Sequence, residues 1–534
     1  MAPSNPSTNP PSPVGEESPP TNRWLDHRSV GVQLHPTSLP SPLGIGVLDA
    51  SAHQLLHFLA DGGFAYWQVC PLGPTGFGDS PYQCFSAFAG NPHLIALDPL
   101  VEAGLLPARA LEPLSASSNH DRVDYAVQYQ LKRPLLAAAH AHWRRSRSEL
   151  PYGDFATFRH RVASWLDDYA YFTALKQHFS GRPWWEWPAE LQSRELAVRS
   201  SLRRQLAVEI EAAAFSQYLF FGQWSALRAL AAQLNIRLIG DAPIFVAGDS
   251  ADVWANPQLF HLDPQTRLPA RVAGVPPDYF SADGQLWGNP LYDWTAHAAD
   301  GYRWWLDRLR TNFDLFDVVR IDHFRGFDAC WAIPAGQPTA RTGRWESGPG
   351  AAFFRAVRNS LPAARLIAED LGQLTPSVHV LREAAALPGM AVLQFAFGGG
   401  PDNPYLPHNH LMDCVVYPGT HDNDTTLGWY ASADEGTRDH VRRYLRVDGS
   451  EVGWDFVRAA YASVANLAVV SLPDLLSLGS EARFNTPGCG QGNWAWRYRG
   501  EMLQVLAENS GAYLRELGSL FGRSGSMVTG AENR

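Results

Sequence analysis

The chain has 534 residues, 45% of them hydrophobic, with a formal net charge of −10 and a pI near 6.0. This length exceeds that of most single domains but fits a barrel with insertions, and it supplies enough apolar residues for a large core. The acidic balance argues against a nucleic-acid partner, which normally requires a basic surface. No apolar run reaches 18 residues, so no membrane span and no membrane partner are expected.

The two ends of the chain are expected to lack fixed structure. Residues 1–22 are rich in Pro and Ser and have neither the basic region nor the apolar core of a secretory signal. Residues 522–534 are predicted to be a flexible tail. Five widely spaced cysteines form no CxxC pair, which favours free thiols in a reducing compartment, so a cytoplasmic location is expected.

Eight short apolar runs are predicted to be strands of one parallel sheet. They lie at residues 30–34, 65–69, 236–240, 318–321, 365–368, 392–395, 414–417 and 467–471. Eight parallel strands close a (β/α)8 TIM barrel, which is an α/β fold.

Two long connections interrupt the spacing of these strands. Residues 71–235 contain amphipathic runs and are predicted to be a mainly helical insertion. Residues 245–315 are rich in Gly, Pro and aromatic residues with little periodicity, and are predicted to be a loop-rich insertion of the kind that usually carries function. The catalytic domain is therefore expected to span residues 23–521 as a barrel with large helical and loop insertions.

Carboxylates follow four of the predicted strands. Asp322 ends the segment FDVVRID two residues after Arg320, so both side chains point to one face of the strand. Glu369, Asp422 and Asp241 follow three further runs. Polar residues at such strand ends usually carry chemistry in barrels, and a fixed cation favours the ionised form of a neighbouring carboxyl. Several carboxylates converging on one barrel mouth suit the cleavage of glycosidic bonds.

Short motifs along the chain, in the same order, resemble those of one enzyme family. They are SPLGIGVLD, SPYQCFSAFAGNP, GDAPIFV, GVPPDYFSADGQLWGNPLY, FDVVRIDHFRG, IAEDLG, YPGTHDNDTTLGWY and LGSEARFNTPG. From about residue 30 to residue 498 the chain is similar to the 4-α-glucanotransferases (amylomaltases, or disproportionating enzymes) of glycoside hydrolase family 77, in the α-amylase superfamily.

This resemblance implies a role for each of three carboxylates. Asp322 is expected to be the nucleophile that forms a covalent β-glucosyl-enzyme, and Glu369 the general acid and base. Asp422 is expected to bind ring hydroxyls at the cleavage point. Because two displacements at one carbon retain the configuration, the Asp322 and Glu369 carboxyls should lie about 5–5.5 Å apart. The neighbouring Asp370 is expected to satisfy free amides at a helix N-terminus.

The resemblance also implies substrate contacts and supporting residues. His323 and His421 match residues that touch the sugar at the cleavage point, Tyr82 matches one that stacks under it, and Asp241 matches one that supports Arg320. A mobile loop over the acceptor side is expected to include Asp278, Tyr279, Phe280, Gln285 and Trp287. Asn485 is expected to contact the substrate near the cleft.

Two departures from the family pattern are visible. Gly398 stands where the family has Asp, so that acceptor contact is either absent or supplied by Asp402. Pro473 replaces a Gln before Asp474, and a local backbone change without loss of chemistry is expected there.

The expected activity is transfer of α-1,4-glucan segments between maltooligosaccharides. Two alternatives stay open: an α-amylase-like hydrolase with the same carboxylates, and a non-catalytic amylase-fold glucan-binding protein, which would be expected to have lost one of them. No metal-ligand spacing and no nucleotide motif is present, so neither a metal nor a cofactor is expected. The oligomeric state does not follow from the sequence.

Overall fold

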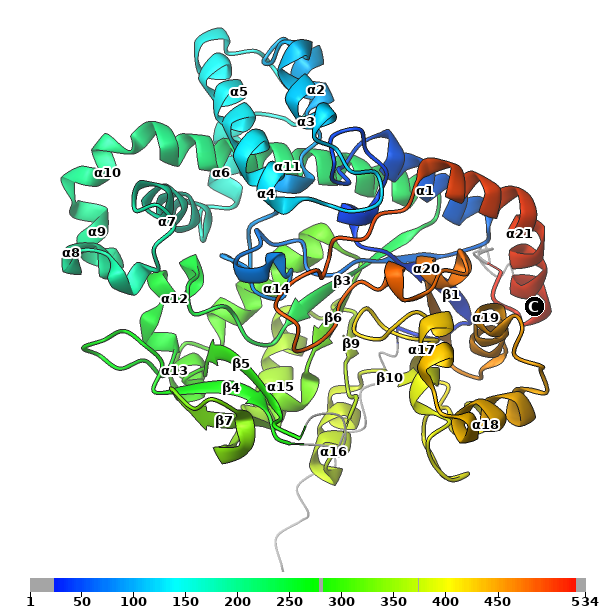
Figure 1. Ribbon diagram of the computed structural model, residues 1–534. Helices are drawn as coiled ribbons and strands as arrows, with labels where there is room; N and C mark the ends of the chain where they lie inside the picture. Colours follow the sequence, from blue (N-terminus) through cyan, green and yellow to red (C-terminus); the bar gives the residue numbers. More distant parts are fainter. Residues whose placement is uncertain (1–23, 278–281, 373, 525–534) are drawn as a thin grey trace, which may run out of the picture.

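The computed structural model describes residues 24–277, 282–372 and 374–524 (Figure 1). The predicted N-terminal tail at residues 1–22 lies outside the described residues, as do residues 525–534 of the predicted C-terminal tail at 522–534. The start of that tail was predicted wrongly, because Arg523 is buried and donates to backbone carbonyls of the barrel. Asp278, Tyr279 and Phe280 of the expected mobile loop lie outside them too.

Eight parallel strands form the predicted barrel. They are β1 (Ser29–Gln33), β2 (Tyr66–Gln68), β3 (Arg237–Pro243), β6 (Val318–Asp322), β9 (Leu366–Ala368), β10 (Gly389–Val392), β11 (Cys414–Tyr417) and β12 (Leu467–Ser471). Their order in the sheet is β10-β11-β12-β1-β2-β3-β6-β9. The Ala368 amide of β9 donates to the Pro388 carbonyl just before β10 at 2.9 Å, which links the two ends of the sheet. The fold is therefore an α/β TIM barrel, as predicted.

The sixth barrel strand differs from the prediction. It was expected at residues 392–395, but the strand is β10 (Gly389–Val392), and Leu393–Phe395 form a 3₁₀ turn. The position of β10 is set by packing, because the Met390 amide donates to the Asp370 carboxylate at 2.7 Å and a side chain at residue 389 would collide with that carboxylate. Gly-Met-Ala has little strand propensity by itself, which explains the error.

Helices fill the connection between β2 and β3. They are α2 (Asp98–Glu102), α3 (Glu112–Ala116), α4 (Tyr125–Val127), α5 (Arg133–Ser146), α6 (Phe155–Arg161), α7 (Leu166–His178), α8 (Ala189–Gln192), α9 (Arg194–Arg199), α10 (Ser201–Gln205) and α11 (Ala207–Gln233). The long helix α11 runs beside the barrel and carries α5, α6 and α7 against it, so the helical part lies over one side of the barrel (Figure 1).

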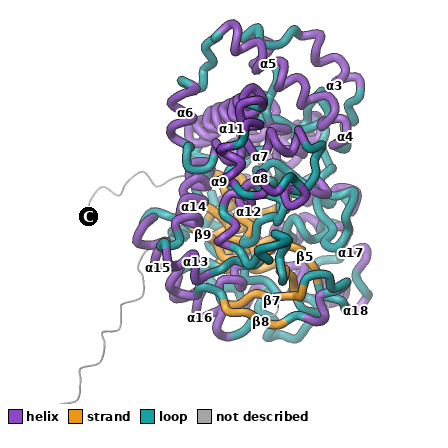
Figure 2. Tube along the Cα trace, turned by 90° about the vertical axis from the view of Figure 1, so that its left-hand side faces the viewer, coloured by secondary structure: helices purple, strands orange, loops and turns teal. Residues whose placement is uncertain are grey.

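The second long connection is less irregular than predicted. It begins with α12 (Ala251–Ala255), continues with the strands β4 (Arg271–Val275) and β5 (Gln285–Pro290), and ends with α13 (Trp294–Ala299) and α14 (Arg303–Leu315). These pair with β7 (Ala329–Pro334) and β8 (Arg344–Ser347) in an antiparallel sheet of order β5-β4-β7-β8, separate from the barrel (Figure 2). Two of its strands precede β6 in the chain and two follow it, so no local sequence pattern predicts the sheet.

The remaining helices surround the barrel. They are α1 (Ala50–Asp61), α15 (Gly350–Ser360), α16 (Pro376–Ala385), α17 (Thr426–Ser432), α18 (Glu435–Leu445), α19 (Val452–Ala462), α20 (Leu472–Leu475) and α21 (Gly500–Leu520). The barrel interior is packed by large apolar side chains such as Ile239, Val318, Ile367, Val415 and Val469. Within the described residues no helix is both long and apolar enough to cross a membrane.

Candidate active site

The ends of β3 and β6 bring an arginine between two aspartates. The strands pair in parallel with Asp241 opposite Arg320, and β3 extends past the predicted strand end to include Asp241. Nη1 of Arg320 lies 2.6 Å from Oδ2 of Asp241 and 3.0 Å from Oδ1 of Asp322. The Arg320 side chain is only 4% exposed, so its charge is compensated by these two carboxylates. The Asp322 side chain is 25% exposed, which leaves it accessible to a substrate.

Glu369 follows β9 and is fixed by the backbone. Its Oε2 accepts the His323 amide at 2.7 Å, and its Oε1 accepts the Leu371 amide at 2.9 Å. His323 adopts a left-handed conformation with φ of 52°, which turns the chain after Asp322 so that its amide faces Glu369. The carboxylates from β6 and β9 thus share one side of the barrel mouth.

Asp370 does not have the predicted role. No helix begins beside it; α16 starts only at Pro376. Instead its carboxylate accepts the Met390 amide and lies 3.1 Å from Nε of Arg382. It joins β9 to β10 and supports the barrel wall.

Asp422 follows β11, which is two strands from β9 around the closed barrel. Its Oδ1 accepts Nδ2 of Asn485 at 2.7 Å and lies 3.4 Å from Nε2 of His421. The Asp422 side chain is 47% exposed, so its second oxygen is free for a ligand. Arg483, which the sequence did not indicate, donates to the Asp422 carbonyl at 2.7 Å and fixes the segment that carries Asn485.

An aromatic wall connects Asp422 with the Arg320 cluster. The Tyr82 ring stacks on His421 at 5.0 Å and 17°, and its hydroxyl donates to Oδ2 of Asp241 at 2.8 Å. Trp494 lies 5.7 Å from both rings and was missed, because a Trp after a Gly-rich loop carries no specific signal. Burial lowers the pKa of His421, so the imidazole is neutral and can share hydrogen bonds with an uncharged sugar.

Trp287 and His323 border the other side of the mouth. Their rings meet edge to face at 4.8 Å and 83°, and Nε1 of Trp287 donates to Oε1 of Gln285 at 3.0 Å. Both Gln285 and Trp287 lie on β5, so the antiparallel sheet contributes to the site. Burial lowers the pKa of His323 to about 3, which makes this imidazole neutral at physiological pH.

The two catalytic candidates experience opposing electrostatic effects. Burial raises the pKa of Asp322 and that of Glu369, while the Arg320 guanidinium acts in the opposite direction on both. Arg320 contacts the Asp322 carboxylate directly and makes no ion pair with Glu369. The direct contact with Arg320 favours ionised Asp322, whereas burial favours protonated Glu369 against the two backbone amides that its oxygens accept. This is the division that an attacking carboxylate and a proton donor require.

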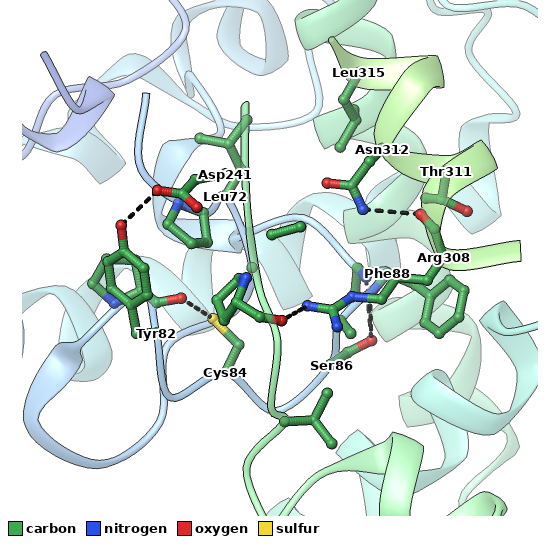
Figure 3. Close-up of a pocket in the computed structure, with 18 of the residues that line it drawn as sticks. Leu72, Tyr82, Cys84, Ser86, Phe88, Asp241, Arg308, Thr311, Asn312 and Leu315 are labelled. Atoms are coloured by element: carbon green, nitrogen blue, oxygen red, sulfur yellow. Dashed lines mark hydrogen bonds between the residues drawn. The ribbon is translucent and has the colours of Figure 1, made fainter. Parts of the chain in front are cut away.

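A small pocket lies beneath the site rather than in the substrate cleft. It has a volume of about 50 Å³, and its lining includes Tyr82, Cys84, Asp241 and Arg308 (Figure 3). None of Asp322, Glu369 and Asp422 lines it. Arg308 extends from α14 and donates to the Pro243 carbonyl at 2.6 Å. Because Pro243 pairs with Asp322 on the neighbouring strand, this bond fixes the end of β3 next to Asp322. This pocket is not the catalytic centre.

The parallel eight-stranded barrel, with three carboxylates and a buried arginine at its carboxyl-terminal mouth, defines a glycosidic-bond enzyme of the α-amylase type. The family model for 4-alpha-glucanotransferases of glycoside hydrolase family 77 matches residues 34–504. The chain belongs to this family and is an enzyme of that class.

Similar proteins agree with this assignment. A 4-alpha-glucanotransferase of Thermus thermophilus is 50% identical over 498 residues, which cover 92% of this chain and 98% of that relative. A 4-alpha-glucanotransferase of Synechocystis is 46% identical over 496 residues, again with 92% and 98% coverage. The solved structure of an amylomaltase from Streptococcus agalactiae in complex with acarbose has a TM-score of 0.88 and 35% identity, and the match covers 93% of this chain and all of that one.

Proposed function

We propose that this enzyme transfers α-1,4-glucan segments between maltooligosaccharides with retention of configuration, through a covalent glucosyl-enzyme on Asp322. The observation that carries the assignment is the 3.0 Å contact between Arg320 and Asp322 at the exposed end of β6. It holds an ionised oxygen in place where a substrate can reach it. The finding that the S. agalactiae amylomaltase binds acarbose supports a glucan substrate for this chain.

In the first step Asp322 attacks the anomeric carbon of the donor. The carbon–oxygen bond to the next glucose breaks, and the leaving oxygen takes the proton of Glu369. The two backbone amides that hold Glu369 fix its position toward that oxygen. Asp422 and His421 bind hydroxyls of the same ring, and hydrogen bonds that tighten as the ring flattens lower the barrier.

In the second step an acceptor completes the transfer. Glu369, now ionised, takes the proton from the 4-hydroxyl of another glucan, and this oxygen attacks the anomeric carbon. The ester bond to Asp322 breaks and the aspartate leaves as a carboxylate. Arg320 and Asp241 return Asp322 to its starting position, and Tyr82 supports the sugar from below.

The acceptor side decides between transfer and hydrolysis. Trp287 and Gln285 lie beside His323 on the Glu369 side of the mouth, where they can hold an acceptor sugar and exclude water. Asn485, through its bond to Asp422, is assigned to orientation of the donor side. Asp278 follows β4 in the sequence and lies outside the described residues, so its assignment to the acceptor side rests on the family resemblance. Gly398 lies at an exposed turn, and no acceptor contact is assigned to it.

The proposed substrate also bears on the partners and the location of the enzyme. A neutral polysaccharide needs no basic surface, so neither nucleic acid nor a lipid surface is proposed as a partner. Free thiols are consistent with a cytoplasmic location, although some plant relatives are described as chloroplastic.

The product profile from maltotriose tests the proposal. A transferase converts maltotriose into glucose and a ladder of longer maltooligosaccharides, which chromatography with pulsed detection resolves. Glucose and maltose without longer products would identify a hydrolase instead. No turnover by the folded protein would identify a glucan-binding protein.

A further inference from the structure

The antiparallel sheet β5-β4-β7-β8 carries a row of residues that the active site does not use. Leu286 pairs with Gly274, Gly274 with Trp331, and Trp331 with Trp345, so the four lie side by side across the four strands. Paired residues of neighbouring strands point to the same face of a sheet. We call Leu286, Gly274, Trp331 and Trp345 the outer row. With strands about 4.8 Å apart, the row is roughly 14 Å long.

The outer row faces away from the catalytic centre. Along β5, Gln285 and Trp287 flank Leu286 and point to the opposite face, because successive side chains of a strand alternate. Trp287 contacts His323 on that inner face, where Ala273 is fully buried. On the outer face, Leu286 is 43% exposed and Trp345 is 42% exposed. One face of the sheet therefore borders the site. On the other face Val272 and Ile333 are buried with Ala340, whereas Leu286 and Trp345 meet solvent at its two edges.

Trp345 is an unusual tryptophan in this protein. All 19 tryptophans lie among the described residues, and Trp345 is the only one of them that is exposed. Its ring is also held in place: the Arg325 guanidinium lies 3.9 Å from the ring centroid, and the Trp331 ring meets it at 5.2 Å and 64°. A fixed aromatic face in water loses little entropy when it binds a ligand. These contacts distinguish Trp345 from an ordinary exposed apolar residue.

The Trp345 end of the row is joined to the Glu369 side of the mouth. Arg325 follows His323 by two residues, so their Cα atoms are at most roughly 7 Å apart. The His323 amide holds Glu369. Tyr82 and His421 lie instead on the wall between Asp422 and the Arg320 cluster. A glucan that passes Glu369 as leaving group or acceptor can therefore continue toward Trp345.

We propose that the outer row is a binding platform for the distal part of long α-1,4-glucans on the acceptor side of the active site. Aromatic faces pack on the apolar faces of sugar rings, and Trp345 offers such a face at the β8 end of the row. Trp331 packs under Ala340 and supports the Trp345 ring from beside it. A charged pair lies beside the row and can bond to hydroxyls: Arg341 pairs with Asp283 at 2.7 Å, and both side chains are exposed. A neutral polyhydroxylated chain fits this mixture.

A second copy of the protein fits the outer row less well. A stable dimer needs about 800 Å² of buried surface on each partner, whereas this row exposes only two large apolar side chains strongly. The glucan proposal rests on the proposed function, since a platform without a transferase site beside it would have no acceptor to hold.

Binding to an inactive protein tests the platform without turnover. In an Asp322→Asn background, the dissociation constant for amylose is measured by retardation in native gels that contain the polymer. We expect Trp345→Ala to raise this constant about fivefold and Trp345→Phe to raise it less. Tyr513→Ala, an exposed aromatic on α21, is the matched control and should change nothing. Equal retardation of the Trp345→Ala and Tyr513→Ala proteins would overturn the proposal.

Kinetics of the active enzyme separates the platform from the catalytic centre. Trp345→Ala should raise KM about fivefold for maltohexaose as acceptor and leave kcat and KM unchanged for glucose as acceptor. An equal loss with glucose would mean that the substitution disturbs Arg325 and His323, and would overturn the platform. A dimer that Trp345→Ala converts to a monomer in size-exclusion chromatography would also overturn it. If the wild-type enzyme makes no ladder from maltotriose, the proposed function itself fails, whatever the gels show.

Discussion

Buried arginines occur at both ends of the barrel, and they are compensated in different ways. At the mouth, Arg320 lies between the carboxylates of Asp241 and Asp322. At the base, Arg523 is fully buried and donates to six backbone carbonyls, those of Ser29, Ala460, Tyr461, Ser463, Ala465 and Asn466. Arg28 adds three more bonds to carbonyls nearby.

The helix directions of the fold explain the difference. In a (β/α)8 barrel each helix runs back from the mouth and ends at the base, where its last carbonyls lack partners. The carbonyl end of α19 lies there, and a guanidinium satisfies those groups without any acid. Burial lowers the pKa of Arg523 to about 9, which still leaves it charged at neutral pH. At the mouth, by contrast, Arg320 lies against carboxylates, one of which we propose as the nucleophile.

The largest expected effect is at the mouth. Asp322→Asn should reduce turnover of maltotriose by about four orders of magnitude or more, because the amide cannot form the glycosyl ester. The melting temperature should change little, since Asp241 still pairs with Arg320. The rate of product formation from maltotriose and the melting temperature are measured on the same preparation. Residual activity of more than a few per cent would place the nucleophile elsewhere.

Glu369, which we propose as the proton donor, is expected to give the next largest effect and a dependence on pH. Glu369→Gln should lower transfer from maltotriose by about 10³-fold, yet lower transfer from α-glucosyl fluoride much less, because fluoride leaves without a proton. Burial raises the pKa of Glu369, so the protonated donor persists above the usual range of a glutamic acid. The rate should fall as pH rises through that raised pKa for maltotriose and remain flat there for the fluoride. Equal losses on both donors would exclude this role.

The base of the barrel should show the opposite behaviour. Arg523→Met leaves several buried carbonyls without a donor, and we expect a loss of about 3 kcal/mol in the free energy of unfolding. Activity at 25 °C should be nearly unchanged in the folded fraction. Denaturant unfolding and initial rates decide this together. A variant that keeps its stability but loses activity would contradict the contrast between mouth and base.

The smallest effect is expected in the ratio of products. Trp287→Ala removes an aromatic face beside His323, so acceptor capture should weaken more than donor cleavage. Hydrolysis should rise a few-fold relative to ladder formation from maltotriose, even as the total rate falls. Trp454→Ala, a half-buried tryptophan packed against Tyr513 in the helical shell, is the control. The same ratio in both variants would mean that Trp287 only packs.

Much of the site could be read from the sequence because its residues follow strands. Asp322 ends an apolar run, Glu369 directly follows one, and Asp422 lies five residues after the end of β11. A parallel barrel brings such positions to one mouth. Trp494 was missed since it reaches the site from a loop far along the chain, without a local pattern. Arg483 lies within the motif LGSEARFNTPG, but only its bond to the Asp422 carbonyl in the folded chain shows that it supports the site. Asp370 was misread as a helix cap because its real partners, Met390 and Arg382, lie on other elements.

The sequence by itself determined the α/β barrel and the candidate carboxylates, because short apolar strands and polar strand ends are local features. It also determined the family, because short motifs along the chain carry that resemblance. Only the tertiary structure decided the shift of β10 to Gly389–Val392, the sheet β5-β4-β7-β8, and the outer row that crosses it. Each of these depends on contacts between segments that lie far apart in the sequence. Such contacts are set by packing and hydrogen bonds across the fold, which local propensity does not encode.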